Sequence, residues 1–465
     1  MGTLLWMSGR AFLIALILTP IVRDIFRSYN VVDRPGQRKV HAYPMPRVGG
    51  IAIAIAYGVA LLTGPSSGPL SSSPAAWKLI PGAALVFLTG LLDDFFNLKP
   101  ILKILGLVTA ASVVFFSGLH IGDLATRPLS IWLDFPLTVF WLLLSSNALN
   151  LIDGLDGLCA GMGLLATLTL FSAALLHGNL PLAYATLPLA GALIGFLCYN
   201  VNPATVFLGD SGALLIGFLL GCYGMIWTQK AATLLSMLVP LLALSIPLLD
   251  VSLAVIRRFL RNQPIFSADK RHIHHRLLDR GLSARQAVWV LYLFAALAAA
   301  IALLATSFGG KYQGFFIVLF FAVAWIGIRQ LRYSEFNIAG GLLFGGGLKR
   351  AMDVRLKLEQ VASTLEQADT DEAWWKALTA SASGLGLMQV HWITSQGSRD
   401  EVLVQGTPRW SFRVPLTATD ELEVAGNLAS TAASFDLLAF AELVCRTYPS
   451  RTTEEAPSKV VLATP

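Results

Sequence analysis

The sequence is poor in charge, and its first part lacks one acidic residue type altogether. No glutamate occurs before Glu335, and only 13% of the 465 residues are charged. A soluble domain has about 25% charged residues. This chain is instead 55% hydrophobic, with a mean hydropathy of +0.65. The composition excludes an ordinary soluble enzyme and indicates a membrane protein.

Cysteine is also scarce, with four residues in the chain. Cys159, Cys198 and Cys222 lie in apolar stretches, and Cys445 lies in the C-terminal part. No two of them have the spacing of a metal site, and they do not suggest a disulfide framework. We interpret all four as small core residues.

Long apolar stretches, by contrast, are abundant. Eleven of them, the third one short, are predicted to cross a bilayer as helices, at 4–22, 48–63, 79–92, 101–118, 130–149, 158–176, 182–200, 211–227, 232–256, 286–306 and 312–331. Their length and lack of alternation argue against a porin-like barrel. The first stretch has no small-residue cleavage pattern, so we expect a membrane anchor and not a removed signal peptide.

Basic residues are distributed unevenly between the two sides that these spans define. With the N-terminus outside, the inside loops carry eighteen of the 23 basic residues before Glu335, and the outside segments carry five. Lys and Arg concentrate in cytoplasmic loops. The net charge of +6 is therefore mostly a topology signal, and it does not indicate a nucleic-acid partner.

The composition changes between Glu335 and Gly347. Fifteen of the 28 acidic residues follow position 344. Helices are predicted at 348–368, 371–383 and 434–448, with several short strands between 386 and 426. We predict an all-α polytopic membrane domain with about 11 transmembrane helices over 1–335. A small cytoplasmic accessory α+β domain over 348–450 and a disordered tail over 451–465 follow it.

Five polar clusters interrupt the apolar part, and the predicted topology places all of them on the cytoplasmic side. They are the segment 33–50, the pair Asp93 and Asp94, and the segments 147–157, 207–212 and 269–275. Carboxylates and histidines at membrane depth are costly to keep, so they usually mark a functional site. We therefore expect the clusters to meet at one site.

Asp93 and Asp94 end the third predicted span. Adjacent helical side chains point about 100° apart, so the two carboxylates need not have the same role. Two close carboxylates repel unless a cation lies between them, and Mg²⁺ typically takes one or two protein carboxylates. The alternative is a solvated helix end with a salt bridge to Lys99 or Lys103.

Asn147, Asn150, Asp153 and Asp156 fall at three-residue steps in NALNLIDGLDG. Neighbouring members share a helix face, but an unbroken helix would turn the ends of the series apart. We expect the two glycines of the motif to interrupt the helix and turn Asp156 back inward. A polar loop between spans is the weaker explanation, because such a loop rarely needs two amides and two carboxylates.

Asp210 in FLGDSG is expected at the start of a helix, where it could ligate a metal while backbone N–H groups meet phosphate. Phe207 could stack on a planar base. The plainer alternatives are a helix N-cap for Asp210 and a lipid-facing aromatic for Phe207.

His272, His274 and His275 lie among basic residues in DKRHIHH. Their spacing does not match a closed zinc site, and they suit anionic oxygens as hydrogen-bonding groups or as imidazolium. The alternative is a juxtamembrane loop that holds lipid head groups. Together the clusters predict a site for Mg²⁺ and a diphosphate, open to a soluble nucleotide-sugar and to a lipid phosphate.

In their joint occurrence and order, the five motifs resemble those of the polyprenyl-phosphate N-acetylhexosamine-1-phosphate transferases, glycosyltransferase family 4. The resemblance covers about 33–283. IFSADKRHIHHRLLDRGLS is similar to the GlcNAc-type branch, that of the bacterial undecaprenyl-phosphate GlcNAc-1-phosphate transferases. Asn97 stands at the fifth position of the aspartate-rich motif, which this branch accommodates. The acidic-rich part after Gly347 lies outside the family pattern.

The resemblance implies a role for each matching residue. Asp210 matches the magnesium-binding aspartate, and Asp93 and Asp94 match an essential pair, one of which deprotonates or orients the lipid phosphate. Asp153 and the histidines 272, 274 and 275 are expected with this pair in catalysis. The residues expected to bind substrate are Asn200, Phe207 and Asp156 around the uracil, Asn147 and Asn150 near the sugar diphosphate, and Lys39, His41, Arg47 and Lys103 near the phosphates.

The implied reaction transfers N-acetylglucosamine 1-phosphate from UDP-GlcNAc to undecaprenyl (polyprenyl) phosphate, releases UMP and initiates a surface polysaccharide. Mg²⁺ is the expected cofactor, with Mn²⁺ in its place as an alternative. We expect a single displacement, and a two-step route through Asp93 or Asp94 as nucleophile stays open. The implied location is a bacterial cytoplasmic (inner) membrane, in contact with membrane lipid. A homodimer stays open.

Two other functions compete with this one. Within the enzyme class, the sugar could be a 6-deoxy-hexosamine or MurNAc-pentapeptide, because one sequence does not show the shape of the pocket. From another class, an ion-coupled transporter would place its carboxylates at mid-membrane and make them accessible from both sides. The predicted clusters lie at one face, which favours the enzyme.

Overall fold

The structure is a computed structural model. It describes 2–29, 45–63, 74–124, 127–230, 237–260, 272–308, 312–330, 358–382, 387–395, 397–405, 407, 410–417, 419–426 and 437–449. The chain divides into two compact units, Met1–Arg332 and Tyr333–Pro465. Lys39 and His41 of the predicted site lie outside the described residues, as does the predicted disordered tail 451–465.

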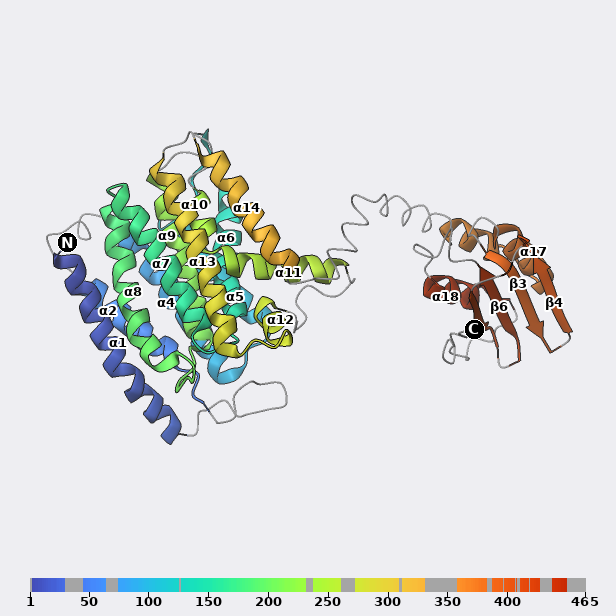
Figure 1. Ribbon diagram of the computed structural model, residues 1–465, viewed down its shortest axis with the longest axis horizontal. Coiled ribbons are helices and arrows are strands. Elements are labelled where there is room, and N and C mark those ends of the chain that lie inside the picture. The colour runs from blue at the N-terminus through green and yellow to red at the C-terminus, as the bar shows by residue number, and fades with distance from the viewer. Residues whose placement is uncertain are drawn as a thin grey trace. The chain divides into compact units, whose positions relative to one another are not determined.

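The first unit is a bundle of helices (Figure 1). In chain order they are α1 (Gly2–Ser28), α2 (Gly49–Leu62), α4 (Pro74–Phe96), α5 (Pro100–Phe116), α6 (Ile131–Ile152), α7 (Leu158–Leu176), α8 (Leu180–Asn200), α9 (Gly209–Lys230), α10 (Leu238–Ala243), α11 (Ser245–Leu260), α12 (Ile273–Asp279), α13 (Ala284–Ser307) and α14 (Gln313–Gln330). A two-residue pair of strands, β1 (Asp123–Leu124) and β2 (Arg127–Pro128), precedes α6.

Within the described residues, seven helices are long and apolar enough to cross a membrane, namely α1, α4, α6, α7, α8, α9 and α13. Shorter apolar helices of 10–17 residues lie in α2, α5, α11 and α14. The prediction of a mostly helical, multi-pass protein is therefore confirmed. The number of eleven transmembrane helices stays a prediction, as does the side of the membrane on which each loop lies.

The predicted span at 232–256 is not one continuous helix. The structure has α10 and α11 there, and they meet at Leu244. Pro247 lies in the first turn of α11 and has no N–H, so it cannot donate the backbone hydrogen bond that a continuous helix needs at that position. In Figure 1, α11 runs across the bundle, unlike its long neighbours.

Helix α9 is the central element of the bundle, because 94% of the residues in its apolar 18-residue stretch are buried. The N-terminal turn of α9 is approached closely by α2 and α4 at glycine positions. A Cβ atom on Gly90 of α4 would lie 2.5 Å from Ser211 Cα, and one on Gly50 of α2 would overlap Gly212. These contacts fix the start of α9 against the end of α4, which is where Asp210 and the aspartate pair are found.

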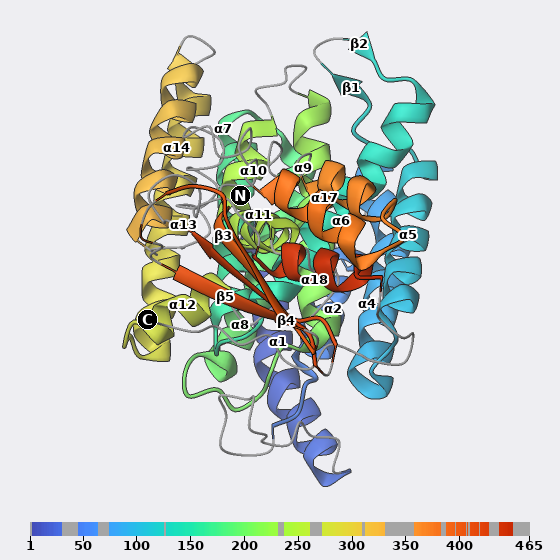
Figure 2. The same cartoon turned by 90° about the vertical axis from the view of Figure 1, so that its right-hand side faces the viewer.

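The second unit contains a four-stranded antiparallel sheet in the order β4-β3-β6-β5. The strands are β3 (Leu387–Thr394), β4 (Gly397–Val402), β5 (Trp410–Pro415) and β6 (Glu421–Gly426), and α17 (Asp371–Ala382) and α18 (Leu437–Thr447) accompany them (Figure 2). Alternate strand residues such as Trp392 and Val424 form one core with residues of both helices, such as Trp374 and Phe440. The predicted small C-terminal sheet with flanking helices is confirmed.

Candidate active site

Four polar side chains from four helices meet where α4 and α6 end and α5 and α9 begin. Lys103 Nζ lies 2.9 Å from Asp93 Oδ2 and 2.6 Å from Asp210 Oδ2, so one ammonium group is shared between two carboxylates. With its amide oxygen turned toward Lys103, Asn150 accepts from Nζ at 3.1 Å and donates to Asp210 Oδ1 at 2.9 Å. Residues from three separate motifs, together with Lys103, therefore form one polar cluster.

The two neighbouring aspartates at the end of α4 have different partners, as their positions on the helix predict. Asp93 Oδ1 accepts from the Leu98 backbone N–H at 2.7 Å, and Asp93 Oδ2 faces the lysine. Asp94 Oδ1 accepts from the backbone N–H of Asp210 at 2.8 Å, and Oδ2 accepts from that of Ser211 at 3.0 Å.

Asp94 therefore caps the N-terminus of α9 from another helix. The first N–H groups of a helix have no partner within the helix, and a carboxylate there also meets the positive end of the helix dipole. Gly209, at φ +77°, allows the close approach, because a Cβ atom on it would lie 2.8 Å from Asp94 Oδ2. Asp210 begins the helix as predicted, but the capping carboxylate belongs to Asp94.

The asparagine- and aspartate-rich motif breaks the helix as predicted. Helix α6 ends at Ile152, and α7 begins at Leu158 after Gly157 at φ +77°. Asp156 turns toward the loop before α9, where Oδ2 accepts from Asn202 Nδ2 at 2.9 Å and from the Ala204 N–H at 3.0 Å. The motif thus supplies Asn150 to the polar cluster and Asp156 to the next loop.

Asp153 directly follows the last residue of α6 and lies among the other carboxylates of the site. Burial, followed by the charges of Asp210 and Asp94, raises the pKa of Asp153 to about 8, and Arg47 opposes this effect. Asp153 therefore holds a proton more readily than an exposed aspartate does.

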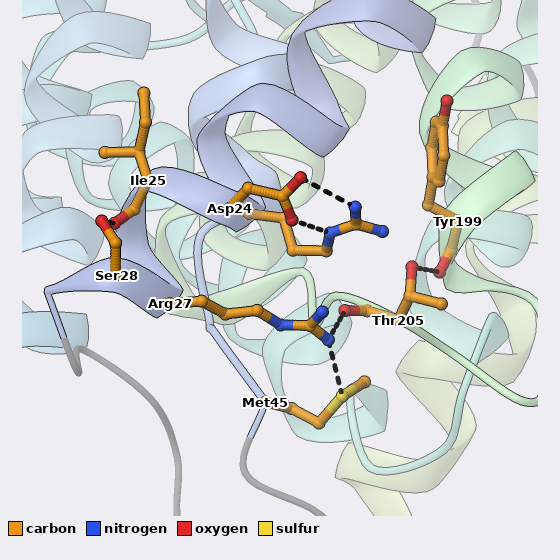
Figure 3. Close-up of polar contacts among 8 residues, drawn as sticks. Asp24, Ile25, Arg27, Ser28, Met45, Tyr199 and Thr205 are labelled. Carbon is orange, nitrogen blue, oxygen red and sulfur yellow. Dashed lines mark hydrogen bonds and ion pairs between the residues drawn. The ribbon is translucent and has the colours of Figure 1, made fainter.

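The loop between α8 and α9, which carries Phe207, is held at several points. Arg27 at the end of α1 donates to the Thr205 carbonyl at 3.1 Å (Figure 3). The buried Asn200 accepts from the Gly157 N–H at 3.1 Å and donates to the Val206 carbonyl at 2.9 Å. The amide of Asn200 therefore connects two loops of the site.

Phe207 and Arg47 lie beside each other in a short parallel bridge. The Phe207 N–H donates to the Pro46 carbonyl at 3.0 Å, and the Gly49 N–H donates to the Phe207 carbonyl at 2.9 Å. The bridge brings the end of the first polar segment to the site. Asn147, by contrast, lies three residues before Asn150 on α6 and donates back to the Leu143 carbonyl of its own helix at 2.8 Å.

The histidines meet the site through α12. His274 is 2% exposed, and a Cβ atom on Gly154 would lie 2.6 Å from its Nε2 atom. Its ring stacks on that of His272 at 5.8 Å and lies 4.3 Å from that of His275. Burial, and then the charge of His275, lowers the pKa of His274 to about 4, so at neutral pH this residue is a neutral imidazole and not imidazolium.

The residues of the site suit a magnesium ion. In the part of the chain that the structure describes, no group of three or more His, Cys, Asp or Glu side chains forms a complete metal site. Mg²⁺ does not need one, because it is bound through one or two carboxylates and completes its shell with water and substrate phosphates. Asp210 and Asp93, which already share one cation, are the carboxylates that could hold it.

Some contacts of the site had no signal in the sequence. Asp94 lies 116 residues from the helix that it caps, and the reach of Arg27 to Thr205 spans 178 residues. Lys103 was a predicted phosphate ligand and also an alternative salt-bridge partner, and the structure places it between two carboxylates. A basic residue one turn into the helix after the aspartate pair was the available clue.

These features define a multi-pass membrane protein with a polar site of carboxylates, an amide and a lysine at the ends of its helices. The model of glycosyl transferase family 4 matches residues 76–228. A probable undecaprenyl-phosphate N-acetylglucosaminyl 1-phosphate transferase of Bacillus subtilis is 37% identical over 288 residues, which are 61% of this chain and 79% of the relative. A decaprenyl-phosphate N-acetylglucosaminephosphotransferase of Mycolicibacterium smegmatis is 36% identical over 321 residues, 61% and 77% of the two chains.

A more distant relative is the undecaprenyl-phosphate alpha-N-acetylglucosaminyl 1-phosphate transferase of Escherichia coli K12. It is 29% identical over 311 residues, which are 63% of this chain and 82% of the relative. The chain belongs to glycosyl transferase family 4 and is a sugar-phosphate transferase. The resemblance predicted from the five motifs is thereby confirmed.

Proposed function

We propose that this protein transfers N-acetylglucosamine 1-phosphate from UDP-GlcNAc to a polyprenyl phosphate such as undecaprenyl phosphate and releases UMP. The names of its relatives support the acceptor and the sugar. The observation that carries the proposal is the cation shared by Asp93 and Asp210 at the end of an apolar helix bundle. Such a place can receive a soluble diphosphate and a lipid phosphate together.

The contacts of each residue indicate its role in the reaction. Lys103 lies where it can leave one carboxylate and neutralise a phosphate oxygen, and Arg47 adds positive charge on the other side of the site. Asp93 faces the lysine with one oxygen and is the group that accepts the proton of the lipid phosphate or orients it. Most of the acceleration then comes from positioning and from charge, as in other phosphoryl transfers.

The contacts of Asp94 favour a single displacement over a covalent intermediate on that residue. Both of its oxygens accept backbone N–H groups of α9, so attack on phosphorus would break contacts that hold the helix start. Asp93 keeps one oxygen on a lysine and the other on a backbone N–H. We therefore assign direct attack on the β-phosphorus of UDP-GlcNAc to the lipid phosphate oxygen.

A magnesium ion, or manganese in its place, would be held by Asp210. When bound, it would supply Lewis-acid stabilisation of the diphosphate and of the departing UMP. The carboxylates of Asp93 and Asp210, which meet on one lysine, support a cation at this place. Chelation should abolish transfer, and added Mg²⁺ should restore it.

We place the site on the cytoplasmic side of a bacterial inner membrane. The support is the uneven distribution of Lys and Arg between the two sides of the predicted topology, together with the solubility of a nucleotide-sugar donor. The product would be a lipid-linked diphospho-sugar that starts a cell-surface polysaccharide. The C-terminal unit, without a catalytic cluster among its described residues, would be accessory.

The test is transfer by the purified full chain in detergent with undecaprenyl phosphate, Mg²⁺ and radiolabelled UDP-GlcNAc. We expect a labelled lipid product and exchange of labelled UMP into the donor, both lost in Asp210→Asn. Parallel reactions with UDP-MurNAc-pentapeptide and a UDP-6-deoxy-hexosamine decide the sugar. Absence of exchange with every donor, or full activity of Asp210→Asn, contradicts the proposal.

A further inference from the structure

One buried aspartate that belongs to none of the five motifs lies beside the histidines. Asp250 lies within α11 and is 1% exposed. Its Oδ1 atom accepts from the Ile273 N–H, in the first turn of α12, at 3.0 Å. Its Oδ2 atom lies 3.3 Å from Nδ1 of the buried His272. One carboxylate thus contacts both the start of α12 and an imidazole ring.

From this ring, contacts continue to the aspartate-rich motif. The rings of His272 and His274 are nearly parallel, at 7° and 5.8 Å between centroids. The His274 ring packs on Gly154, where no side chain larger than hydrogen would fit without displacement. Gly154 directly follows Asp153, at the end of α6. A displacement of His272 would therefore reach the site through one stacked ring.

We propose that Asp250 is a positioning residue that fixes the His272 imidazole and, through the stacked rings, the His274 ring against Gly154. This inference rests on the proposed function, because the histidines matter to transfer only if a diphosphate binds beside them. A carboxylate next to Nδ1 favours the tautomer with the proton on that nitrogen and leaves Nε2 as the free atom. Asp250 itself does not touch the reacting atoms.

The burial of Asp250 indicates that its carboxylate has a role beyond packing. An ionisable group taken out of water is expensive unless it is paired and hydrogen-bonded. Here the Ile273 N–H supplies the hydrogen bond to the carboxylate, and the His272 imidazole lies beside the other oxygen at ion-pair distance, 3.3 Å. The other titratable groups that act electrostatically on His274 are His275 and His272, in addition to Asp250.

The chain offers a matched control at the opposite end of α6. Asp134 is 4% exposed, its Oδ2 lies 2.6 Å from His120 Nδ1, and its Oδ1 accepts from the Gly122 N–H at 3.1 Å. In both places a buried carboxylate has one oxygen near an imidazole and the other on a backbone N–H, although His120 is more exposed than His272 and Thr138 also donates to Asp134 Oδ1, at 3.2 Å. Asp134 lies in the first turn of α6 and Asn150 in its last, so Asp134 is remote from the site.

The kinetic test compares Asp250→Asn with Asp134→Asn in the full chain, at equal amounts of folded enzyme. Loss of an orienting partner of this kind typically costs about 10- to 100-fold. We expect kcat of Asp250→Asn to fall by that factor with little change in the KM for UDP-GlcNAc, and Asp134→Asn to keep wild-type values. In a double-mutant cycle, Asp250→Asn should cause no further loss in a His272→Gln background. Full additivity, or equal kcat of the wild type and Asp250→Asn, overturns the inference.

A second readout requires no turnover. In the wild-type protein in detergent, diethyl pyrocarbonate should modify His272 slowly because the ring is buried. Asp250→Asn should accelerate this modification, measured by mass spectrometry of the peptide, and Asp134→Asn should leave it unchanged. Equal labelling in all three proteins refutes the positioning role even if transfer proceeds. If the wild type transfers sugar phosphate from no UDP-sugar, the proposed function is refuted, and the labelling result can still be interpreted.

Discussion

Asp94 offers the sharpest test of how the site is built. Its two oxygens accept the backbone N–H groups of Asp210 and Ser211 at 2.8 and 3.0 Å. Replacing it with asparagine leaves one acceptor oxygen and turns an NH₂ group toward a backbone donor. Replacing it with alanine removes both acceptors. If the role of Asp94 is to cap α9, both variants should lower stability together with activity.

The size of the effect follows from the number of hydrogen bonds lost. A hydrogen bond to a charged group contributes about 1.5–3 kcal/mol, and a backbone donor left without a partner in a buried place costs a similar amount. We therefore expect Asp94→Asn to lose about 1.5–3 kcal/mol of stability and Asp94→Ala about twice as much. Asp93→Asn keeps an acceptor for the Leu98 N–H and loses mainly the lysine contact, so its activity should fall far more than its stability.

The assay is thermal unfolding in detergent, followed by size-exclusion chromatography of the heated samples, with transfer measured on the surviving folded protein. The midpoint of unfolding should order as wild type, Asp93→Asn, Asp94→Asn and Asp94→Ala, from highest to lowest. An unfolding midpoint of Asp94→Asn equal to that of the wild type would falsify the capping role. Asp94 would then again be a candidate for a residue that takes part in a chemical step of the reaction.

Three further outcomes are expected. Gly154→Ala should reduce kcat/KM at least tenfold and lower the free energy of unfolding by about 1–3 kcal/mol, since its Cβ would lie 2.6 Å from His274 Nε2. Gly58→Ala, with open space around it, should be neutral or slightly stabilising in the same assays. Lys103→Met should lower kcat/KM about 100-fold at saturating Mg²⁺, because Asp93 and Asp210 lose the cation that they share. The pKa of His274 is lowered from 6.5 to about 4, so the folded protein resists protonation of this residue. The stability that its neutral form contributes is therefore complete above pH 6.5 and is lost as the pH falls toward 4. Across this range the unfolding midpoint should drop more in the wild type than in His274→Gln.

Local features of the site could be predicted from the sequence where they depend on the chain near them. Two glycines in NALNLIDGLDG predicted the break between α6 and α7, and the structure ends α6 at Ile152. Helical geometry predicted different roles for Asp93 and Asp94, and their contacts differ. Both predictions rest on backbone freedom or on periodicity, which a single sequence displays directly.

Features that depend on tertiary contacts were not predictable in the same way. Nothing near Asp94 indicates which helix it caps, because its partners lie 116 and 117 residues away. The hydropathy of 232–256 predicts one span, since a mean over many residues does not register that Pro247 lacks a backbone donor. Asp250 lies outside the five motifs, and only the fold places it beside His272.

The arrangement of these contacts explains why the polar clusters can lie so close to lipid. Four carboxylates of the site are also structural partners: Asp94 holds the start of α9, Asp156 holds the loop before it, and Asp93 and Asp210 hold the same lysine. The cost of removing charge from water is thus offset by hydrogen bonds and ion pairs that also fix the bundle. Binding of a diphosphate would draw on the same lysine, so the charge that holds the two carboxylates together is the charge that substrate would engage. Substrate would then compete with internal contacts and not with bulk water, which is the condition under which fixed charges act most strongly on a reaction.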